Sequence, residues 1–399
     1  MNKSTFFAGQ PIFSQVINLM SGCPIKKIAQ SYQADRYCKK FKTYDHLVVL
    51  LYTIFNRCTS LREVVTGLMA CETKLNHLGV HYSVPRSTLA DANSRRDWRV
   101  FESIYHWLYK RYHQVLPDSH PKKNWFSRLY IADSTTISLF QEILKGAGIR
   151  SVDGKRKGGI KAHTLIKAEE DVPCLVCLTP AACADTTFMQ QIHLAKGSIL
   201  TFDKGYNNYK KLQEWDNQGI SWVTRRRKAA IIETLEDRPL SQIQLDQGVQ
   251  NDQWVVMGHN HHKTTKIKVR LISYYDKEHQ RQFQFLTNNT SLSALTIANI
   301  YKHRWQIETL FKRIKQNYPL RNFLGDSENA IKVQIWCALI ADLLLKIIQK
   351  QVKRPWAFAN LASMIRLHLM TYIHLWRFLN QPEKTLRQTS FSPPSLFPT

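Results

Sequence analysis

The stretch from residue 128 to residue 228 constrains the fold of this chain more than any other segment. Three runs rich in β-branched and apolar residues follow one another there, separated by clusters of Gly, Lys or Asp, and each run is typical of a strand. A helix-like stretch, a strand, a helix closed by Gly219 and a last strand come next. In order, the segments are 128–140, 159–168, 172–181, 186–197, 198–206, 208–219 and 220–228. This order predicts a mixed α/β core.

The regions around this core have different patterns. Apolar residues recur at helical spacing before residue 120 and again from about residue 291. Three strand-like runs after residue 229 indicate a separate antiparallel element, and the last twenty residues are rich in Pro and Ser. The predicted parts are a helical N-terminal domain (1–120), the first part of the core (121–228), a β-rich insertion (229–285), a helical second part of the core (286–378) and a flexible tail (379–399).

The composition adds a large excess of positive charge. The chain has 56 Lys and Arg against 30 Asp and Glu, a formal net charge of +26. Such an excess predicts a polyanionic partner, and DNA or RNA is favoured because neutralised phosphates release counterions. Two basic clusters, 155–161 with Lys161 and 225–228 with Arg225 and Arg227, are expected to follow a nucleic-acid backbone, although solvated surface charge is the alternative.

The helical N-terminal domain is the predicted DNA-binding domain. Its segment 83–97 contains Ser87, a possible helix cap, and ends with Arg95 and Arg96. A helix-turn-helix and an ordinary capped helix both fit this pattern.

Several other classes are disfavoured. The eight cysteines form no regular framework, which predicts free thiols in a reducing cytoplasm, and the first residues lack the apolar stretch of a signal peptide. The longest apolar run, 335–348, is short for a membrane span and contains Asp342 and Lys346, so a buried helix and no membrane partner are predicted. No Gly-rich phosphate-binding motif suggests a nucleotide cofactor.

Two groups of possible zinc ligands are also disfavoured. Cys174 and Cys177 lie three residues apart in a predicted strand, so their side chains point to opposite faces, and Cys183 alone completes no site. The histidines of the 259–262 segment are expected to form a solvated polar turn.

The segment 301–317 is the most informative one for function. At about 100° per residue, its polar residues Tyr301, Arg304, Glu308 and Lys315 form a stripe about 60° wide, and an apolar face opposes it. The apolar residues are Ile307, Leu310, Phe311 and Ile314. One continuous helix with a polar row is predicted, although an ordinary solvated face with an Arg–Glu pair also fits.

Two aspartates lie in apolar strands of the predicted core. Asp133 follows Ile131 in the first strand, and Asp203 directly follows Phe202 in another. A carboxylate in such a place is costly unless a partner or a metal compensates its charge. Together with Glu308 they are candidates for one site, although each alone also fits an ordinary strand-end residue.

These residues resemble a known family. The spacing Y-x2-R-x3-E-x6-K at Tyr301, Arg304, Glu308 and Lys315 is similar to the signature of bacterial DDE transposases of the insertion sequence four family. The segments DKGY (203–206), FLTNN (285–289) and RWQIE (304–308) also look like motifs of that family. The resemblance extends from about residue 129 to residue 346.

The resemblance implies a ribonuclease-H-like catalytic core, interrupted by the insertion, in which Asp133, Asp203 and Glu308 hold two Mg²⁺ ions, with Mn²⁺ as a substitute. Oxygen-only ligands suit these ions, which would clamp the attacking and leaving oxygens of an in-line displacement. The expected activity is cleavage of the ends of an insertion sequence and their joining to target DNA.

The resemblance further implies which residues hold DNA. Tyr301, Arg304 and Lys315 are expected at phosphates beside the cut, and Trp254 in the insertion is expected to stack on a flipped base, although a core role for it is the alternative. The expected partners are terminal inverted repeats and target DNA, bound by a dimer in the bacterial cytoplasm at the nucleoid. A ribonuclease-H-like nuclease without strand transfer and an inactive DNA-binding relative are the alternatives.

Overall fold

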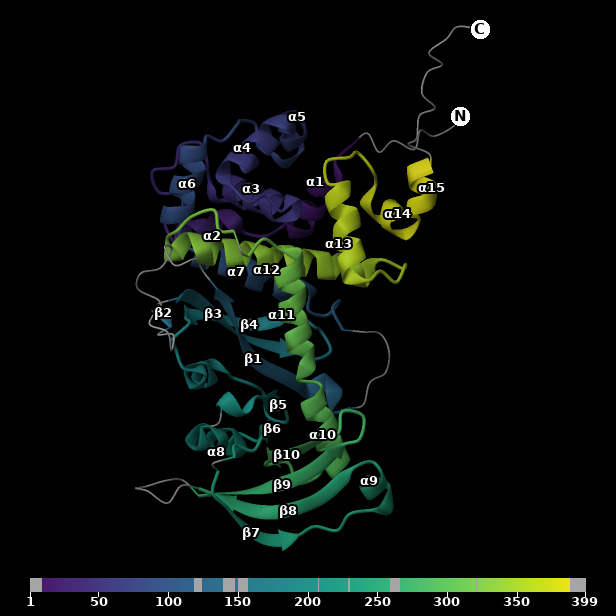
Figure 1. Ribbon diagram of the computed structural model, residues 1–399. Helices are drawn as coiled ribbons and strands as arrows, with labels where there is room; N and C mark the ends of the chain where they lie inside the picture. The colour runs from purple at the N-terminus through teal and green to yellow at the C-terminus, as the bar shows by residue number, and fades with distance from the viewer. Residues whose placement is uncertain are drawn as a thin grey trace. The chain divides into compact units, whose positions relative to one another are not determined.

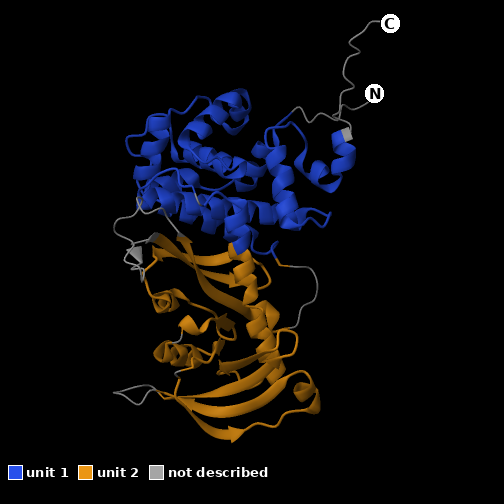
Figure 2. Ribbon diagram, viewed as in Figure 1, with its two compact units in different colours: residues 1–116, 312–399 blue, residues 117–311 orange. Residues whose placement is uncertain are grey.

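The computed structural model describes residues 9–117, 124–138, 148–149, 157–206, 208–228, 230–258, 266–320 and 322–387, and the chain separates into two compact units (Figure 2). The first, here called the helical unit, combines residues 1–116 with residues 312–399. The second, the sheet unit, contains residues 117–311. The basic residues at 155 and 156 and the histidines of the 259–262 segment lie outside the described residues.

The helical unit is built around one long buried helix, α12. This helix is apolar on all sides and is buried along almost its whole length, as expected for a central helix. It contacts α3, α6, α7 and α13 (Figure 1). The α-helices of the unit are α1 (Ile12–Ile17), α2 (Ile25–Ser31), α3 (Thr43–Asn56), α4 (Leu61–Ala70), α5 (Glu72–Leu75), α6 (Arg86–Arg95), α7 (Arg99–Tyr112), α12 (Glu328–Gln351), α13 (Phe358–Leu367), α14 (Leu375–Asn380) and α15 (Pro382–Arg387).

The apolar run 335–348 is buried within α12, so the prediction of a buried helix is confirmed. Its acid, Asp342, is 2% exposed and accepts a hydrogen bond of 3.0 Å from Arg313. Among the described residues, no helix has the length and apolar character that crossing a membrane requires.

In the described part of the sheet unit, the strands form one ten-stranded sheet. Its strands are β1 (Leu129–Ser138), β2 (Gly148–Ile149), β3 (Lys157–Lys167), β4 (Pro173–Pro180), β5 (Ile199–Phe202), β6 (Ser221–Arg225), β7 (Ile232–Asp237), β8 (Val249–Met257), β9 (Ile267–Asp276) and β10 (Arg281–Thr287). Its helices are η3 (Phe126–Arg128), η4 (Asp185–Gln191), η5 (Lys204–Tyr206), α8 (Tyr209–Asn217), α9 (Gln242–Asp246) and α10 (Ala294–Lys302), with the first part of α11 (Trp305–Asn317).

The strand order in the sheet is β2-β3-β1-β5-β6-β10-β9-β8-β7, and β4 also pairs with β3. Strands β1, β5 and β6 are parallel, whereas β3 is antiparallel to β1. Helix α8 connects β5 to β6; the Asn208 side chain caps its start, and Gly219, with a φ of +71°, follows its end. The predicted mixed α/β core is therefore confirmed.

The predicted insertion is not a separate element. Strand β10 pairs with β6 through Phe285 and Arg225, so β10, β9, β8 and β7 continue the core sheet (Figure 1). Val255, Val269 and Leu271 of this part share one apolar cluster with Trp222 of β6. Pairing between β6 and β10 joins residues about sixty positions apart, which local sequence patterns do not specify.

Four further expectations differ from the structure. The segment 186–197 contains only the short 3₁₀-helix η4, and Ser87 lies inside α6, which begins after Pro85 without a side-chain cap. Residues from Lys312 onward group with the N-terminal helices and not with the sheet, because α12 packs on α3 and α7. The chain also remains helical through α15 to Arg387, where a tail was expected from residue 379.

Candidate active site

Strand pairing brings the two predicted aspartates to the same end of the sheet. Ala132 of β1 lies opposite Phe202 of β5 in a parallel register, so the next residues, Asp133 and Asp203, follow on neighbouring strands. Asp133 lies within β1, and its Oδ1 accepts a hydrogen bond of 2.8 Å from the Ser134 N–H. Asp203 lies just beyond β5, at the turn that opens η5.

Arg304 connects the first aspartate to the predicted glutamate. Its Nη1 lies 2.7 Å from Asp133 Oδ2, and its Nη2 lies 2.5 Å from Glu308 Oε1. The side chains of Asp133 and Arg304 are only 17% and 14% exposed, so this charged contact is largely shielded from water. The structure therefore brings Asp133, Arg304 and Glu308 together.

Tyr301 completes the connection to the second aspartate, because its hydroxyl donates to Asp203 Oδ1 at 3.3 Å. The continuous helix predicted over 301–317 is wrong. Tyr301 belongs to the last turn of α10, Arg304 lies in the break, and α11 begins at Trp305.

Tertiary contacts hold this break. The ring of His303 lies 4.9 Å from Phe126 and 5.7 Å from Trp125, between ring centroids, while Arg304 reaches Asp133. The break thus turns Tyr301 toward Asp203 and Arg304 toward Asp133. The predicted apolar face of α11 is nevertheless buried.

Burial and neighbouring charges shift the pKa values of this network. Burial raises the pKa of Asp133 to about 6; the Ser134 N–H and Arg304 oppose that rise, and Asp203 and Glu308 add to it. Burial also raises the pKa of the Tyr301 hydroxyl to about 12. For Arg304, burial lowers the pKa, but Tyr301, Asp133 and Glu308 outweigh it and raise the pKa, so its guanidinium stays charged.

A fourth acid, Asp185 at the start of η4, lies beside this network and was not predicted. Its Oδ1 accepts hydrogen bonds from Ser134 Oγ at 2.9 Å and from Lys161 Nζ at 3.2 Å. A Cβ built on Gly205 would lie 3.6 Å from Asp185 and 3.9 Å from Asp203, so the Gly205 position separates the two acids. The sequence signal for Asp185 is weak, because an acid before a helix-like segment is usually a cap.

The basic residues predicted to follow DNA have different places. Lys161 is 15% exposed and also donates to the Cys183 carbonyl at 2.9 Å, so its ammonium group is engaged within the protein. Arg227 is exposed, and its guanidinium donates to the Lys204 and Gly205 carbonyls at 2.7 and 2.9 Å. Arg227 therefore supports the turn that follows Asp203. Arg225 lies with its guanidinium 5.1 Å from the Phe283 ring.

Lys315 lies on the same side of α11 as Glu308, two turns and about 10 Å farther along the helix. It belongs to the residues that group with the helical unit.

Trp254 of β8 is half-buried, and two cations lie over its ring. The guanidinium carbon of Arg238 is 5.2 Å and the ammonium of Lys268 is 4.9 Å from the ring centroid. These contacts are typical of cation–π interactions. The tryptophan at the start of α11, Trp305, is 66% exposed and was not singled out from the sequence.

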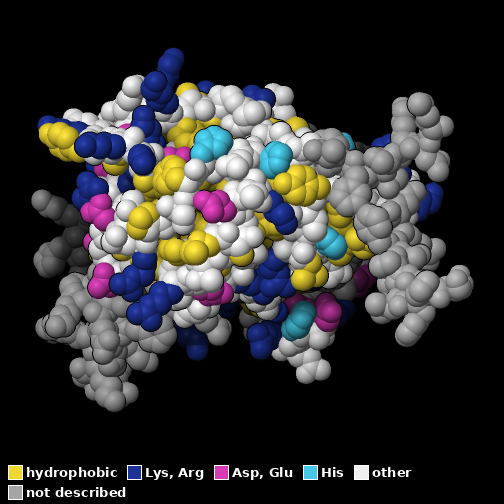
Figure 3. All heavy atoms as spheres, turned by 90° about the horizontal axis from the view of Figure 1, so that it is seen from above, with side chains coloured by type: hydrophobic (Ala, Val, Ile, Leu, Met, Phe, Trp, Pro, Cys, Tyr) yellow, Lys and Arg dark blue, Asp and Glu magenta, His cyan; other side chains and the backbone are white. Residues whose placement is uncertain are grey.

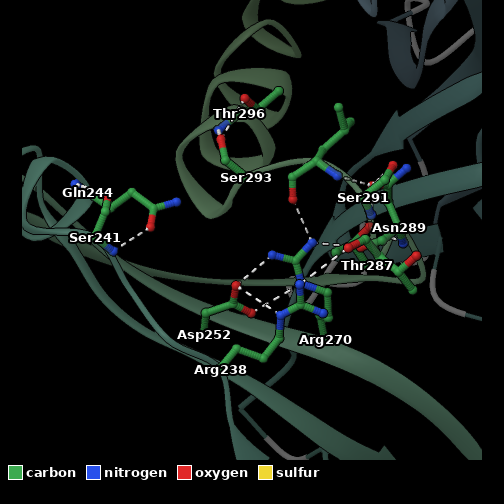
Figure 4. A network of polar contacts seen from close by, with 12 residues as sticks. Arg238, Ser241, Gln244, Asp252, Arg270, Thr287, Asn289, Ser291, Ser293 and Thr296 are labelled. Atoms are coloured by element: carbon green, nitrogen blue, oxygen red, sulfur yellow. Dashed lines mark hydrogen bonds and ion pairs between the residues drawn. The ribbon is translucent and has the colours of Figure 1, made fainter.

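A buried ion pair links the outer strands of the sheet to the loop before α10 (Figure 4). Arg270 of β9 is 1% exposed and contacts Asp252 of β8 with hydrogen bonds of 3.1 and 2.6 Å. The same guanidinium donates to the carbonyls of Asn289 and Leu292, each at 2.8 Å. Because this loop leads into α10, Arg270 helps to fix the start of the helix that carries Tyr301.

The donor set suits a hard divalent cation, since all three predicted ligands offer carboxylate oxygens. Within the described residues, the three acids do not form a group whose oxygens all lie within 4.8 Å of one another. The guanidinium between Asp133 and Glu308 accounts for this spacing, because it supplies the positive charge that their carboxylates share. A bound metal ion would supply this positive charge in place of the guanidinium. The three acids therefore fit a metal ion when the Arg304 side chain moves away from Asp133 and Glu308.

Family models match two regions of the chain. A family model described as "Transposase DDE domain" matches residues 124–344, more than half of the chain, and includes all three acids. A second model, described as a domain of unknown function, matches residues 8–81.

Several proteins are similar to the chain. A protein of Sinorhizobium fredii named as transposase y4zB is 30% identical over 65% of this chain and 70% of its own length. The transposase named for insertion sequence element IS5377 of Geobacillus stearothermophilus is 27% identical over 57% of this chain and 58% of its own. The transposase named for insertion sequence element IS4SA of Synechocystis is 23% identical over 72% of this chain and 78% of its own.

Among solved structures, the piggyBac transposase synaptic complex with hairpin DNA aligns with a TM-score of 0.43 at 10% identity, over 97% of this chain and 85% of that one. The extent of the family match and the identity to these relatives lead to one conclusion: the chain belongs to the family of transposases with a DDE domain.

Proposed function

We propose that Asp133, Asp203 and Glu308 are the three acids that give this transposase its activity. The observation that carries the proposal is the Arg304 bridge from Asp133 to Glu308, joined to Asp203 by neighbouring strands and by the Tyr301 hydroxyl. Two of the acids share one cation, and the third is linked to the same network through Tyr301, which supports a common site.

DDE transposases use divalent metal ions, and we propose Mg²⁺ here, two ions for each site, with Mn²⁺ as a substitute. Bound ions supply Lewis acidity and neutralise the charge on the transferring phosphoryl group. Asp133, Asp203 and Glu308 would hold them. Ser134 N–H and Tyr301 would orient the Asp133 and Asp203 carboxylates through the hydrogen bonds that they already donate.

Arg304 would then change partners. With the carboxylates engaged elsewhere, its guanidinium would be free to hold a phosphate of the DNA with a bidentate contact.

Water would first attack the phosphodiester at the end of the element, which would leave a 3′-hydroxyl on the element and a 5′-phosphate on the flanking DNA. That 3′-hydroxyl would then attack a phosphodiester of the target DNA and displace a target 3′-hydroxyl. Lys315, Arg225, Arg227 and Trp254 are further proposed DNA contacts, with Trp254 stacking on a base. Lys161 is also a proposed DNA contact, although its ammonium group is engaged by Asp185 and by the Cys183 carbonyl.

The core around this site is proposed to be ribonuclease-H-like. The order β4-β3-β1-β5-β6, with β3 antiparallel to three parallel strands, supports this assignment. We further propose a dimer on DNA in the bacterial nucleoid and a DNA-binding N-terminal domain. The core would be interrupted in sequence by residues 229–285, whose strands continue the core sheet.

The test is an incubation of purified protein with Mg²⁺ and a plasmid that carries the flanking inverted repeats. Strand-joined products are expected, and Asp133→Asn, Asp203→Asn and Glu308→Gln should each abolish cleavage while DNA binding is kept. Cleavage without joined products would instead identify a nuclease. Unchanged activity in all three variants would refute the assignment of the acids.

A further inference from the structure

The connection from α2 to α3 in the helical unit is held from the inside by one buried arginine. Arg96, directly after α6, is 3% exposed and donates to the carbonyl of Ala34 at 3.3 Å and to that of Phe41 at 2.9 Å. It also donates to Asp35 Oδ1 at 3.2 Å. The same carboxylate oxygen accepts from the N–H and the hydroxyl of Thr43, at 2.7 and 2.8 Å, where α3 begins. Both ends of the segment 33–42 are therefore anchored.

The backbone of this segment is strained as well as anchored. Gln33 and Tyr37 have φ values of +50° and +61°, in the left-handed region that costs a non-glycine residue of order 1–2 kcal/mol. Such a conformation persists only where surrounding contacts determine it, and here Arg96 and Asp35 provide them. The Tyr37 side chain is 84% exposed.

The outer side of the segment is basic. Its exposed cations are Arg36, Lys39, Lys40 and Lys42. The exposed Lys26 and Lys27 of α2 line one groove together with Arg36 and Lys42, and Lys39 and Lys40 line a second groove that Arg36 also lines. The only acid of the segment is Asp35, whose Oδ1 is used by Arg96 and Thr43. Within residues 9–117, none of the five lysines makes an ion pair with an acidic side chain.

Figure 3 shows Lys and Arg side chains among exposed hydrophobic ones on the left side of the molecule, where α2 and α6 lie in Figure 1. The Arg36 guanidinium carbon lies 4.9 Å from the centroid of the Tyr37 ring, so a cation and an aromatic side chain are presented together.

We propose that the segment 33–42, with Lys26 and Lys27, is a preorganised binding site for the phosphate backbone of duplex DNA. A segment whose backbone is already anchored loses less conformational freedom when its side chains meet a row of phosphates, and each neutralised phosphate releases counterions. An anionic membrane is a poorer match, because interfacial binding needs a broad apolar face and Tyr37 is the only large apolar side chain of this segment that is strongly exposed. Arg95 of α6 is ion-paired with Asp91, so its charge is less available to a phosphate than the charges of the segment.

This inference takes its choice of DNA from the proposed function, and it gives a role to part of the region 8–81 that matches a domain of unknown function. Contacts to phosphates carry no sequence information directly, so the site would anchor the protein on DNA of any sequence.

The test measures binding of the full chain to a short duplex of arbitrary sequence by fluorescence anisotropy, in a chelator and at several salt concentrations. The variant combines Arg36→Ala, Lys39→Ala and Lys40→Ala, all exposed positions that leave the Arg96 contacts intact. Its affinity should fall about 10-fold or more at physiological salt, and the slope of log K against log salt should decrease by about 2.7, or about 0.9 for each lost phosphate contact.

A matched control combines Lys110→Ala, Lys353→Ala and Lys384→Ala, three exposed lysines of the same unit outside the segment. This control loses the same charge. Its slope of log K against log salt should change by less than about 0.9, the value for one phosphate contact. Equal losses in the two triple variants would overturn the proposal, and so would reduced association with anionic lipid vesicles at unchanged DNA affinity. Because no metal is present, the result is independent of whether Asp133 and its partners catalyse cleavage.

Discussion

The Arg304 guanidinium lies between the carboxylates of Asp133 and Glu308, with hydrogen bonds of 2.7 and 2.5 Å. In a protein without bound metal, this guanidinium neutralises acids that would otherwise repel one another. If the proposed metal ions bind to Asp133 and Glu308, Arg304 must first release both carboxylates. The proposal therefore makes the guanidinium and the metal competitors for the same two oxygens.

Arg304→Ala should consequently be stabilised by Mg²⁺ more than the wild-type protein. The variant leaves two acids without their cation, so added Mg²⁺ should raise its melting temperature by a larger amount. Cleavage should nevertheless fall by about 10²–10³-fold, since a charged donor to phosphate is lost. Thermal unfolding with and without Mg²⁺ measures the first effect. The exposed Lys302→Ala is the control, and a smaller Mg²⁺ shift in Arg304→Ala than in that control would contradict competition.

The raised pKa of Asp133 predicts a pH dependence of stability in the absence of metal. The folded-state pKa of about 6 exceeds the unfolded value near 4, so the native state binds more protons between these values. The stabilisation is complete below about pH 4 and is lost as the pH rises through about 6. Above that pH, Asp133→Asn should have a free energy of unfolding about 1–3 kcal/mol higher than that of the wild-type protein.

Urea unfolding in a chelator between pH 4 and pH 8 measures this difference. Glu236→Gln removes an exposed acid and is the matched control. A difference between Asp133→Asn and wild type that stays constant over the whole range would show that Asp133 has no raised pKa.

Asp185 is expected to act as a positioning residue through Ser134 and Lys161. Asp185→Asn leaves the Lys161 ammonium, 15% exposed, without a carboxylate, and cleavage should fall about 10-fold. The double variant Asp185→Asn with Lys161→Met should lose less free energy of unfolding than the sum of the two single variants. The expected coupling energy is about 0.5–3 kcal/mol. Additive losses in both cleavage and stability would show that the pair does not act as a unit.

The buried pair of Arg270 and Asp252 predicts a strong effect on stability. Arg270→Met leaves Asp252, 5% exposed, near a single remaining cation and removes both hydrogen bonds to the loop before α10. The free energy of unfolding should decrease by about 3–5 kcal/mol. Arg238→Ala, which removes a more exposed cation from the same acid, should cost less than about 1 kcal/mol. Similar losses in the two variants would refute the buried pair as the dominant contact.

The sequence by itself determined features that depend on one element at a time. Apolar runs followed by an acid indicated β1 and β5, helical spacing indicated the buried face of α11, and a long, mostly apolar run indicated that α12 is a buried helix. These patterns are local, because the identity of each side chain within one strand or helix decides which face is buried. The resemblance to a known family then implied that Asp133, Asp203 and Glu308 form one site.

Only the tertiary structure decided how these elements combine. The pairing of β6 with β10, the break at Arg304, the position of Asp185 beside Ser134 and the use of Arg96 to hold a basic loop all depend on contacts between residues far apart in the chain. Such contacts are set by the packing of whole elements and by the need to pair buried charges, and no window of neighbouring residues specifies them.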